Sequence, residues 1–202
     1  MIIDWELTGH GWARCRLSAA DGQDVGLVCG YLTDALADLV AAASGLYGPA
    51  RRIRFFFDDE PAELRWVLSR GGSEEVDDVD DVEVDDVEVT VYRFPDVAVS
   101  LDLPDSAGSV VWRSTQPRPE FAHAVLEAAE AVLARYGEDG YRERWGQHDY
   151  PVALVQDLRR LHLRDCACGA AHDQGAADAP EAAATSTALR RSQGRGGTAE
   201  PM

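Results

Sequence analysis

In the N-terminal part of the chain, hydrophobic and polar residues alternate along several short segments, as they do in β-strands that bury one face. The alternation predicts strands over residues 2–7 and 11–18. A turn at 20–23 is then followed by a third predicted strand over 25–29. We therefore expect the second and third strands to form an antiparallel hairpin.

This hairpin makes a specific prediction about two cysteines. A three-residue loop centred on Gly22 would place Cys15 opposite Cys29, and a loop of any other length would break that pairing. The two thiols could form a redox pair, or they could be two small buried side chains. The second interpretation is favoured, because free cysteine usually behaves as a small hydrophobic residue.

The next segments predict a helix and a second hairpin. Apolar residues recur at helical spacing between Thr33, a candidate N-cap, and Gly45, a candidate stop. Strands are then predicted over 52–57 and 64–68. The residues between them, 58–61, contain three acidic side chains and a proline, a composition typical of a turn.

Alternation returns in the second half of the chain and then gives way to helical spacing. It predicts strands over 87–92, 97–103 and 109–114. An apolar stripe that starts after Pro117 predicts a long helix ending at Gly137. The sequence next predicts a short amphipathic turn over 141–145 and a last helix over 151–163.

This order of strands, one helix, further strands and then helices is typical of an α+β fold. We expect a mainly antiparallel sheet of about six to eight strands, with helices packed on one face. The single domain is predicted to span residues 1–164 and to include an acidic low-complexity loop at 74–86. Large apolar residues are almost absent from 165–202, so this part is predicted to be a disordered tail.

Charge narrows the possible functions more than overall composition does. The 202 residues contain 36 acidic side chains and 19 basic ones, all of them arginine, which gives a net charge of −17. Phosphate backbones and anionic membrane surfaces repel such a chain, so binding to nucleic acid or membrane is disfavoured. The use of arginine without lysine is typical of a GC-rich bacterial genome.

The sequence also carries an expectation about compartment. The chain begins without a basic and apolar signal pattern, and no run of apolar residues reaches the length of a membrane span. We therefore expect a cytoplasmic protein, in which four cysteines argue against a disulfide framework.

An acidic run is the most conspicuous feature of the sequence. Ten of the fifteen residues in 74–88 are acidic, with a period of three that fits neither helix nor strand. The run lacks the glycine and the ligand spacing of a calcium-binding loop. It could be a contact surface for a basic protein or a solvated loop without consequence, and the tolerance of surface loops for added length favours the second interpretation.

If a basic partner binds, the acidic run and the acidic turn of the second hairpin are the candidate surfaces. The candidate partner-binding residues are Asp58, Asp59, Glu60, Asp77, Asp78, Asp80, Asp81, Asp85 and Asp86. Asp58, Asp59 and Glu60 could instead act as acid and base together with His148. A solvated turn is the simpler interpretation, and the chain contains no catalytic or cofactor motif, so no cofactor is expected.

One segment near the C-terminus contains residue types that bind zinc. These residues are His162, Cys166, Cys168 and His172. A single residue between the two cysteines is fewer than structural zinc sites use, and the segment lies where the apolar pattern ends. We therefore interpret it as a frayed helix end and expect no metal there.

Three segments carry a resemblance: 4–13, 58–66 and 137–141. They resemble a family of actinobacterial proteins without an assigned activity, so no functional residue carries over. In size, charge and fold class the chain is also similar to the immunity proteins of bacterial toxin systems. The leading hypothesis is a non-enzymatic interaction protein that binds a basic protein. The alternatives are an enzyme of unrecognised type and a metal-binding protein.

Overall fold

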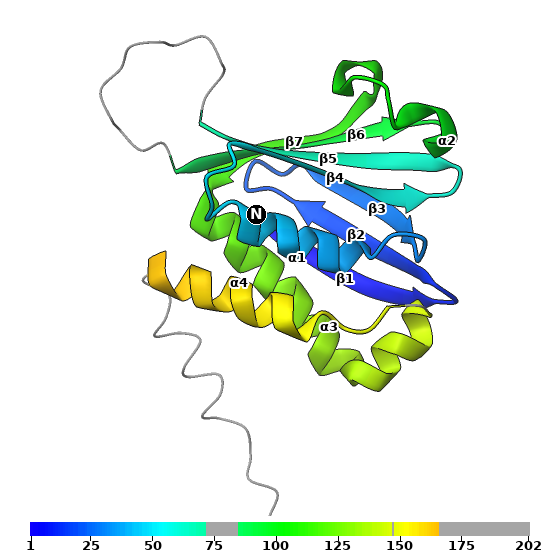
Figure 1. The fold of residues 1–202 in the computed structure, drawn as a ribbon, viewed down its shortest axis with the longest axis vertical. Coiled ribbons are helices and arrows are strands. Elements are labelled where there is room, and N and C mark those ends of the chain that lie inside the picture. The colour runs from blue at the N-terminus through cyan, green and yellow to red at the C-terminus, as the bar shows by residue number, and fades with distance from the viewer. Residues whose placement is uncertain (72–84, 147, 166–202) are drawn as a thin grey trace, which may run out of the picture. The chain divides into compact units, whose positions relative to one another are not determined.

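The computed structural model describes residues 1–71, 85–146 and 148–165, and it shows an α+β protein with two antiparallel sheets (Figure 1). The first sheet has the order β1-β2-β3 and consists of β1 (Ile2–Gly9), β2 (Trp12–Ser18) and β3 (Asp24–Gly30). The second has the order β4-β5-β6-β7 and consists of β4 (Arg52–Asp59), β5 (Ala62–Arg70), β6 (Asp86–Phe94) and β7 (Ser109–Pro117).

Three helices cover one side of the sheets. They are α1 (Ala35–Gly45), α3 (Arg118–Trp145) and α4 (Val152–Asp165), which pack against one another, while α1 and α3 also contact the strands (Figure 1). Two short elements, α2 (Val97–Ser100) and the 3-10 turn η1 (Asp105–Ala107), lie on the other side of the second sheet. No helix in the described ranges is both long and apolar enough to span a membrane.

The predicted α+β class is confirmed, but the single predicted sheet is replaced by two. β3 and β4 contact each other without forming a ladder. At this seam the Asp58 backbone N–H donates to Thr33 Oγ1 at 3.3 Å, so a side chain rather than β3 satisfies it. The predicted tail and most of the predicted acidic loop lie outside the described residues.

Thr33 is therefore not the N-cap of α1, as its sequence position predicted. The N-cap is Asp34, and the Thr33 hydroxyl serves β4 instead. The helix does end at Gly45, as expected.

The register of the first sheet differs from the prediction. Cys15 lies opposite Leu27 and Cys29 opposite Ala13, so the two cysteines are not cross-strand partners. Both thiols are fully buried and free. Burial raises the pKa of both cysteines, which makes them poor nucleophiles and favours the interpretation as small core residues.

One further prediction is corrected, and the break predicted at Gly137 is found. Residues 97–103 do not form a strand, because the Asp96 side chain accepts a hydrogen bond from the Ala98 N–H at 2.8 Å and starts the short helix α2. Gly137, with φ at 65° and ψ at 174°, breaks α3 into two helices, so the first ends where the sequence predicted and the second runs as far as Trp145.

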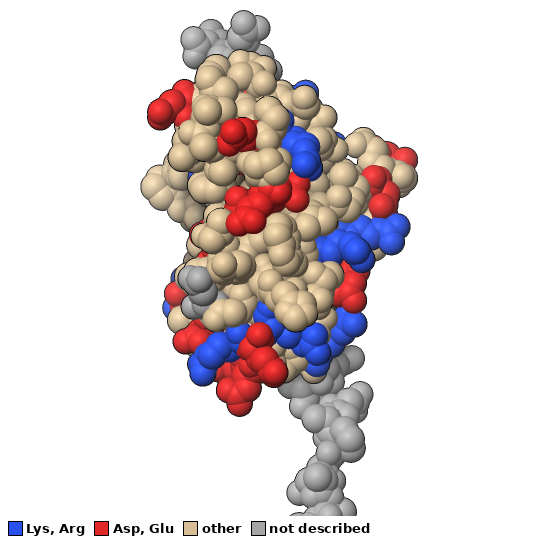
Figure 2. Space-filling model, turned by 90° about the vertical axis from the view of Figure 1, so that its right-hand side faces the viewer, with Lys and Arg blue, Asp and Glu red and all other residues tan. Residues whose placement is uncertain are grey.

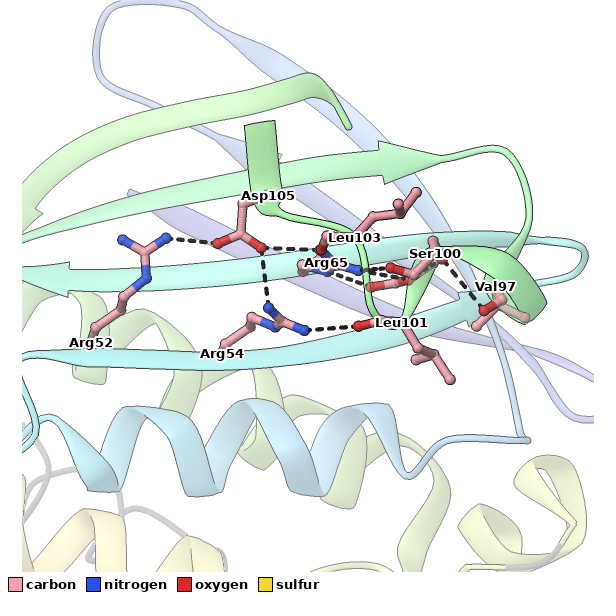
Figure 3. Close-up of polar contacts among 9 residues, drawn as sticks. Arg52, Arg54, Arg65, Val97, Ser100, Leu101, Leu103 and Asp105 are labelled. Carbon is pink, nitrogen blue, oxygen red and sulfur yellow. Dashed lines mark hydrogen bonds and ion pairs between the residues drawn. The ribbon is translucent and has the colours of Figure 1, made fainter. Parts of the chain in front are cut away.

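A buried arginine holds α2 and η1 against the second sheet (Figure 3). The Arg65 side chain is 1 % exposed and donates from Nε and Nη2 to the two oxygens of Glu63, at 2.6 and 3.2 Å. It also donates to the carbonyls of Ser100 and Leu103, both at 2.7 Å, and to Asp105 at 3.1 Å. These five contacts match the five N–H groups of a guanidinium.

An aromatic ring and a second arginine extend the network around Arg65. Its guanidinium carbon lies 4.1 Å from the centre of the Phe94 ring. Arg52 donates to Asp105 at 2.7 Å. Burial alone raises the pKa of Asp105, but the hydrogen bonds from Arg52 and Arg65 outweigh burial, so the pKa is lowered overall. The acidic groups of this network are therefore well compensated.

Removing Arg65 should destabilise the protein far more than removing an arginine at the edge of the network. Arg65→Met leaves Glu63 buried without its counter-charge, at an expected cost of about 3–5 kcal/mol in the free energy of unfolding. Arg54→Met, at a side chain 47 % exposed, should cost less than about 1 kcal/mol. Urea unfolding measures both, and Glu63→Met should recover part of the loss in Arg65→Met. Equal costs for the two arginine variants would show that the buried guanidinium does not hold this network together.

Candidate functional site

Acidic side chains gather at the end of the molecule where α1 begins and β4 ends. We call this group the acidic end, and its residues are Asp34, Asp38, Asp58, Asp59 and Glu60. The Thr33–Asp58 hydrogen bond joins the two segments that supply them. Figure 2 shows this side of the molecule, with acidic side chains close together near the middle of the face.

Asp58 is the most buried member of the acidic end. It is 3 % exposed, and its Oδ2 has no hydrogen-bond partner among the described residues. A Cβ atom at Gly30 would lie 3.2 Å from this oxygen, so the glycine allows the carboxylate to approach the end of β3. Burial raises the pKa of Asp58, and the charges of Glu60 and Asp59 raise it further against an opposing hydrogen bond from the Glu60 backbone.

Asp34 lies within ion-pair distance of a histidine. His148 Nδ1 lies 3.6 Å from Asp34 Oδ2, and His148 Nε2 lies 3.0 Å from the Tyr31 carbonyl oxygen. Burial raises the pKa of Asp34 against the effect of His148, and Asp34 Oδ1 has no hydrogen-bond partner among the described residues. Burial, followed by the charge of Asp34, also raises the pKa of Asp38.

Positive charge at the acidic end is scarce. Arg93 Nη1 lies 2.7 Å from Asp59 Oδ2, yet burial still raises the pKa of Asp59 overall. Within the described part of the chain, Arg93 and His148 are the cations that form ion pairs with these five carboxylates. The site thus carries more negative charge than its own surroundings compensate.

The structure brings together only some of the residues predicted to bind a partner. Asp58, Asp59 and Glu60 lie at one end of the second sheet, whereas Asp85 and Asp86 lie at the other end, where β6 begins. The nine residues of β5 separate the two ends by roughly 25–30 Å. Asp85 pairs with Arg118 at 2.8 Å. Asp77, Asp78, Asp80 and Asp81 lie outside the described residues.

Among the described residues, the ion pair and the hydrogen bond of His148 involve none of Asp58, Asp59 and Glu60, the residues with which the sequence analysis grouped it. The carboxylate with which His148 forms an ion pair is Asp34, a residue that the sequence pattern assigns only to the helix terminus. Tyr141 also escapes prediction: it is fully buried, its hydroxyl has no hydrogen-bond partner among the described residues, and burial followed by the charge of Asp34 raises its pKa. Nothing in the sequence near Asp34 or Tyr141 indicates these positions in the structure.

The chemistry of the acidic end suits a positively charged group. A cation placed here would gain ion pairs with carboxylates that have already lost much of their hydration. The described residues contain no group of three or more histidine, cysteine, aspartate or glutamate side chains arranged to hold a metal ion.

Comparisons with known proteins add no assignment: no family model, no curated protein and no solved structure matches this chain. The resemblance to an actinobacterial family remains a prediction. Function is therefore argued from the geometry and charge of the acidic end.

Neutralising Asp58 should stabilise the protein at neutral pH. The pKa of Asp58 is raised on folding, so the folded state binds the proton more tightly and the free energy of unfolding falls as pH rises through the interval between the unfolded and folded pKa values. Asp58→Asn removes this penalty, and we expect a gain on the order of 1 kcal/mol at pH 7. The gain should disappear below about pH 4, where the aspartate itself is protonated.

Asp24 provides the matched control for this measurement. Hydrogen bonds from Arg16 and Ser18 lower the pKa of Asp24, so Asp24→Asn should have the opposite sign and destabilise the protein at neutral pH. Urea unfolding across the acidic pH range measures both variants. A loss of stability in Asp58→Asn at pH 7 would show that the carboxylate is compensated after all.

Proposed function

We propose that this protein is a non-enzymatic interaction module whose acidic end accepts a cationic side chain of a basic partner protein. The observation that carries the proposal is the negative charge of Asp58, whose carboxylate is buried with an oxygen that has no hydrogen-bond partner among the described residues. It lies beside the more exposed Asp59 and Glu60, which a side chain of a partner can reach. The acidic turn belongs to the surface that the sequence suggested, and the net charge of −17 adds long-range attraction for a basic protein.

Two features of the acidic end favour a protein side chain over a free small cation. The carboxylates come from the N-cap and first turn of α1, from the end of β4 and from the turn that follows it, so they can contact a guanidinium or ammonium from more than one direction. Basic as well as acidic side chains surround the site on this face (Figure 2), so the net charge of −17 rather than a uniformly acidic face would steer a basic surface toward it. An inhibitor or immunity protein that covers a cationic site of a toxin is the class that fits this arrangement.

An acid–base enzyme is the alternative that uses the same residues. Its requirements are a base and an acid that both reach one substrate atom. His148 contacts Asp34 and the Tyr31 carbonyl, whereas the free Asp58 oxygen lies against Gly30. The charge imbalance supports cation binding more directly than it supports this pairing.

The first test uses a fluorescent peptide of alternating arginine and glycine as the probe. Asp34→Asn with Asp58→Asn in the full chain should weaken peptide binding at least about tenfold, which corresponds to about 1.4 kcal/mol. Fluorescence anisotropy measures the affinity. Because bound cations require ionised carboxylates, the affinity of the unmodified protein should also fall as pH is lowered through the acidic range.

The matched control removes the same number of charges from the acidic run. Asp77→Asn with Asp78→Asn should change peptide affinity by less than about threefold at physiological salt, where screening acts beyond ~8 Å. If this control loses binding and the Asp34 and Asp58 variant retains it, the partner surface is the acidic run and the proposal for the acidic end is wrong. Affinity unchanged near ~0.5 M salt would exclude an electrostatic mechanism altogether.

A further inference from the structure

His148, which follows α3, lies between two hydrogen-bond acceptors at the acidic end. Its Nε2 is 3.0 Å from the carbonyl oxygen of Tyr31, in the connection between β3 and α1. Its Nδ1 is 3.6 Å from Asp34 Oδ2, at the N-cap of α1. The histidine side chain is 29 % exposed, so solvent protons can reach it. One imidazole ring therefore connects the C-terminal end of α3 with a segment that supplies carboxylates to the acidic end.

The Tyr31 carbonyl determines which nitrogen of His148 carries the proton in the neutral ring. A carbonyl oxygen can only accept a hydrogen bond, so Nε2 donates to it in both protonation states. In the neutral ring Nδ1 then has a lone pair, and this nitrogen is the one beside the Asp34 carboxylate. A second proton, on Nδ1, replaces two adjacent acceptors with an ion pair. Nδ1 is therefore the atom at which His148 gains and loses its positive charge.

Two carboxylates of α1 respond to this charge. Burial raises the pKa of both Asp34 and Asp38, and the charge of His148 acts in the opposite direction on each. Asp149, the next residue after His148, already pairs with Arg142 at 2.5 Å, so these two charges balance each other. The proton on His148 thus acts mainly on the carboxylates of the acidic end.

The other titratable groups near Asp34 do not compete for this role. Tyr141, on the second part of α3, is fully buried, and burial followed by the charge of Asp34 raises the pKa of its hydroxyl, so it stays uncharged at neutral pH. Asp58 belongs to the same site through the hydrogen bond from its backbone to Thr33. Among these types of side chain, histidine is the one whose charge ordinarily changes between about pH 5 and 8.

We propose that His148 regulates the acidic end: its charged form occupies Asp34 and opposes the cationic side chain of the partner, whereas its neutral form leaves Asp34 for that side chain. This inference rests on the proposed function. A cation that approaches Asp34 meets a second positive charge when the ring is protonated, and it meets only carboxylates when the ring is neutral. A basic partner should therefore bind more tightly as the ring loses its proton and should be released on acidification.

The test compares the affinity of the arginine–glycine peptide for the full chain at about pH 6 and about pH 8 by fluorescence anisotropy. We expect the affinity of the unmodified protein to be about fivefold higher at the higher pH, the effect of one unit charge at ~4 Å in a water-like dielectric. His148→Gln retains an amide that can donate to the Tyr31 carbonyl but carries no charge. Its affinity should change by less than about twofold over the same interval.

A second readout follows the proton itself. If binding requires the neutral ring, peptide binding at about pH 6.5 must release protons, because linkage is reciprocal. Isothermal titration calorimetry in two buffers of different ionisation enthalpy measures this release. It should be present in the unmodified protein and largely lost in His148→Gln. The matched control is His10→Asn, at an exposed histidine with φ at 57°, a conformation that asparagine tolerates, and it should release protons as the unmodified protein does.

Asp34→Asn tests the same pair without altering the histidine, and circular dichroism at both pH values checks that each variant is folded. Its affinity should be lower at about pH 8, and its pH dependence should also shrink to less than about twofold. Equal pH dependence in the unmodified protein, His148→Gln and Asp34→Asn would overturn the role of His148 and leave the proposed function standing. Failure of the peptide to bind at either pH would contradict the proposed function and this inference together.

Discussion

Arg65 lies inside the protein, so each of its N–H groups must find an acceptor, and this constraint determines how residues 97–105 cross the second sheet. Two of the acceptors are the main-chain carbonyls of Ser100 and Leu103, which become available because the segment forms a short helix and a turn rather than a strand. Glu63 supplies the counter-charge from the same face of β5. The segment is thus shaped by one side chain beneath it.

At the acidic end, by contrast, a buried carboxylate lacks a compensating positive charge. Asp58 lies directly across the β4–β5 ladder from Glu63, yet the guanidinium that compensates Glu63 makes no hydrogen bond or ion pair with Asp58. Within a few residues the chain therefore satisfies one buried carboxylate completely and leaves an oxygen of another without a partner among the described residues. Carboxylates held in this way cost stability, and such groups gather at functional sites more often than elsewhere. This contrast is the reason to place function at the acidic end.

Local sequence patterns predicted most of the strands and helices, because alternation and helical spacing record which face each element buries. They failed where a distant side chain determines the backbone. Residues 97–103 alternate like a strand, but Asp96 caps a short helix there. The carbonyls of Ser100 and Leu103 accept hydrogen bonds from Arg65, an arginine more than thirty positions earlier that no local pattern reveals. The acidic turn was found by composition, whereas Asp34, His148 and Tyr141 join it only through tertiary packing.

The seam between the two sheets lies beside the acidic end, because Asp58 belongs to β4 and its carboxylate approaches Gly30 at the end of β3. β3 and β4 form no ladder there, and the Asp58 N–H donates to the Thr33 hydroxyl instead. Thr33 directly precedes Asp34, the N-cap of α1, so this hydrogen bond joins the two segments that carry the acidic side chains. The hydroxyl that the sequence pattern assigned to the helix therefore contributes to the arrangement of the site.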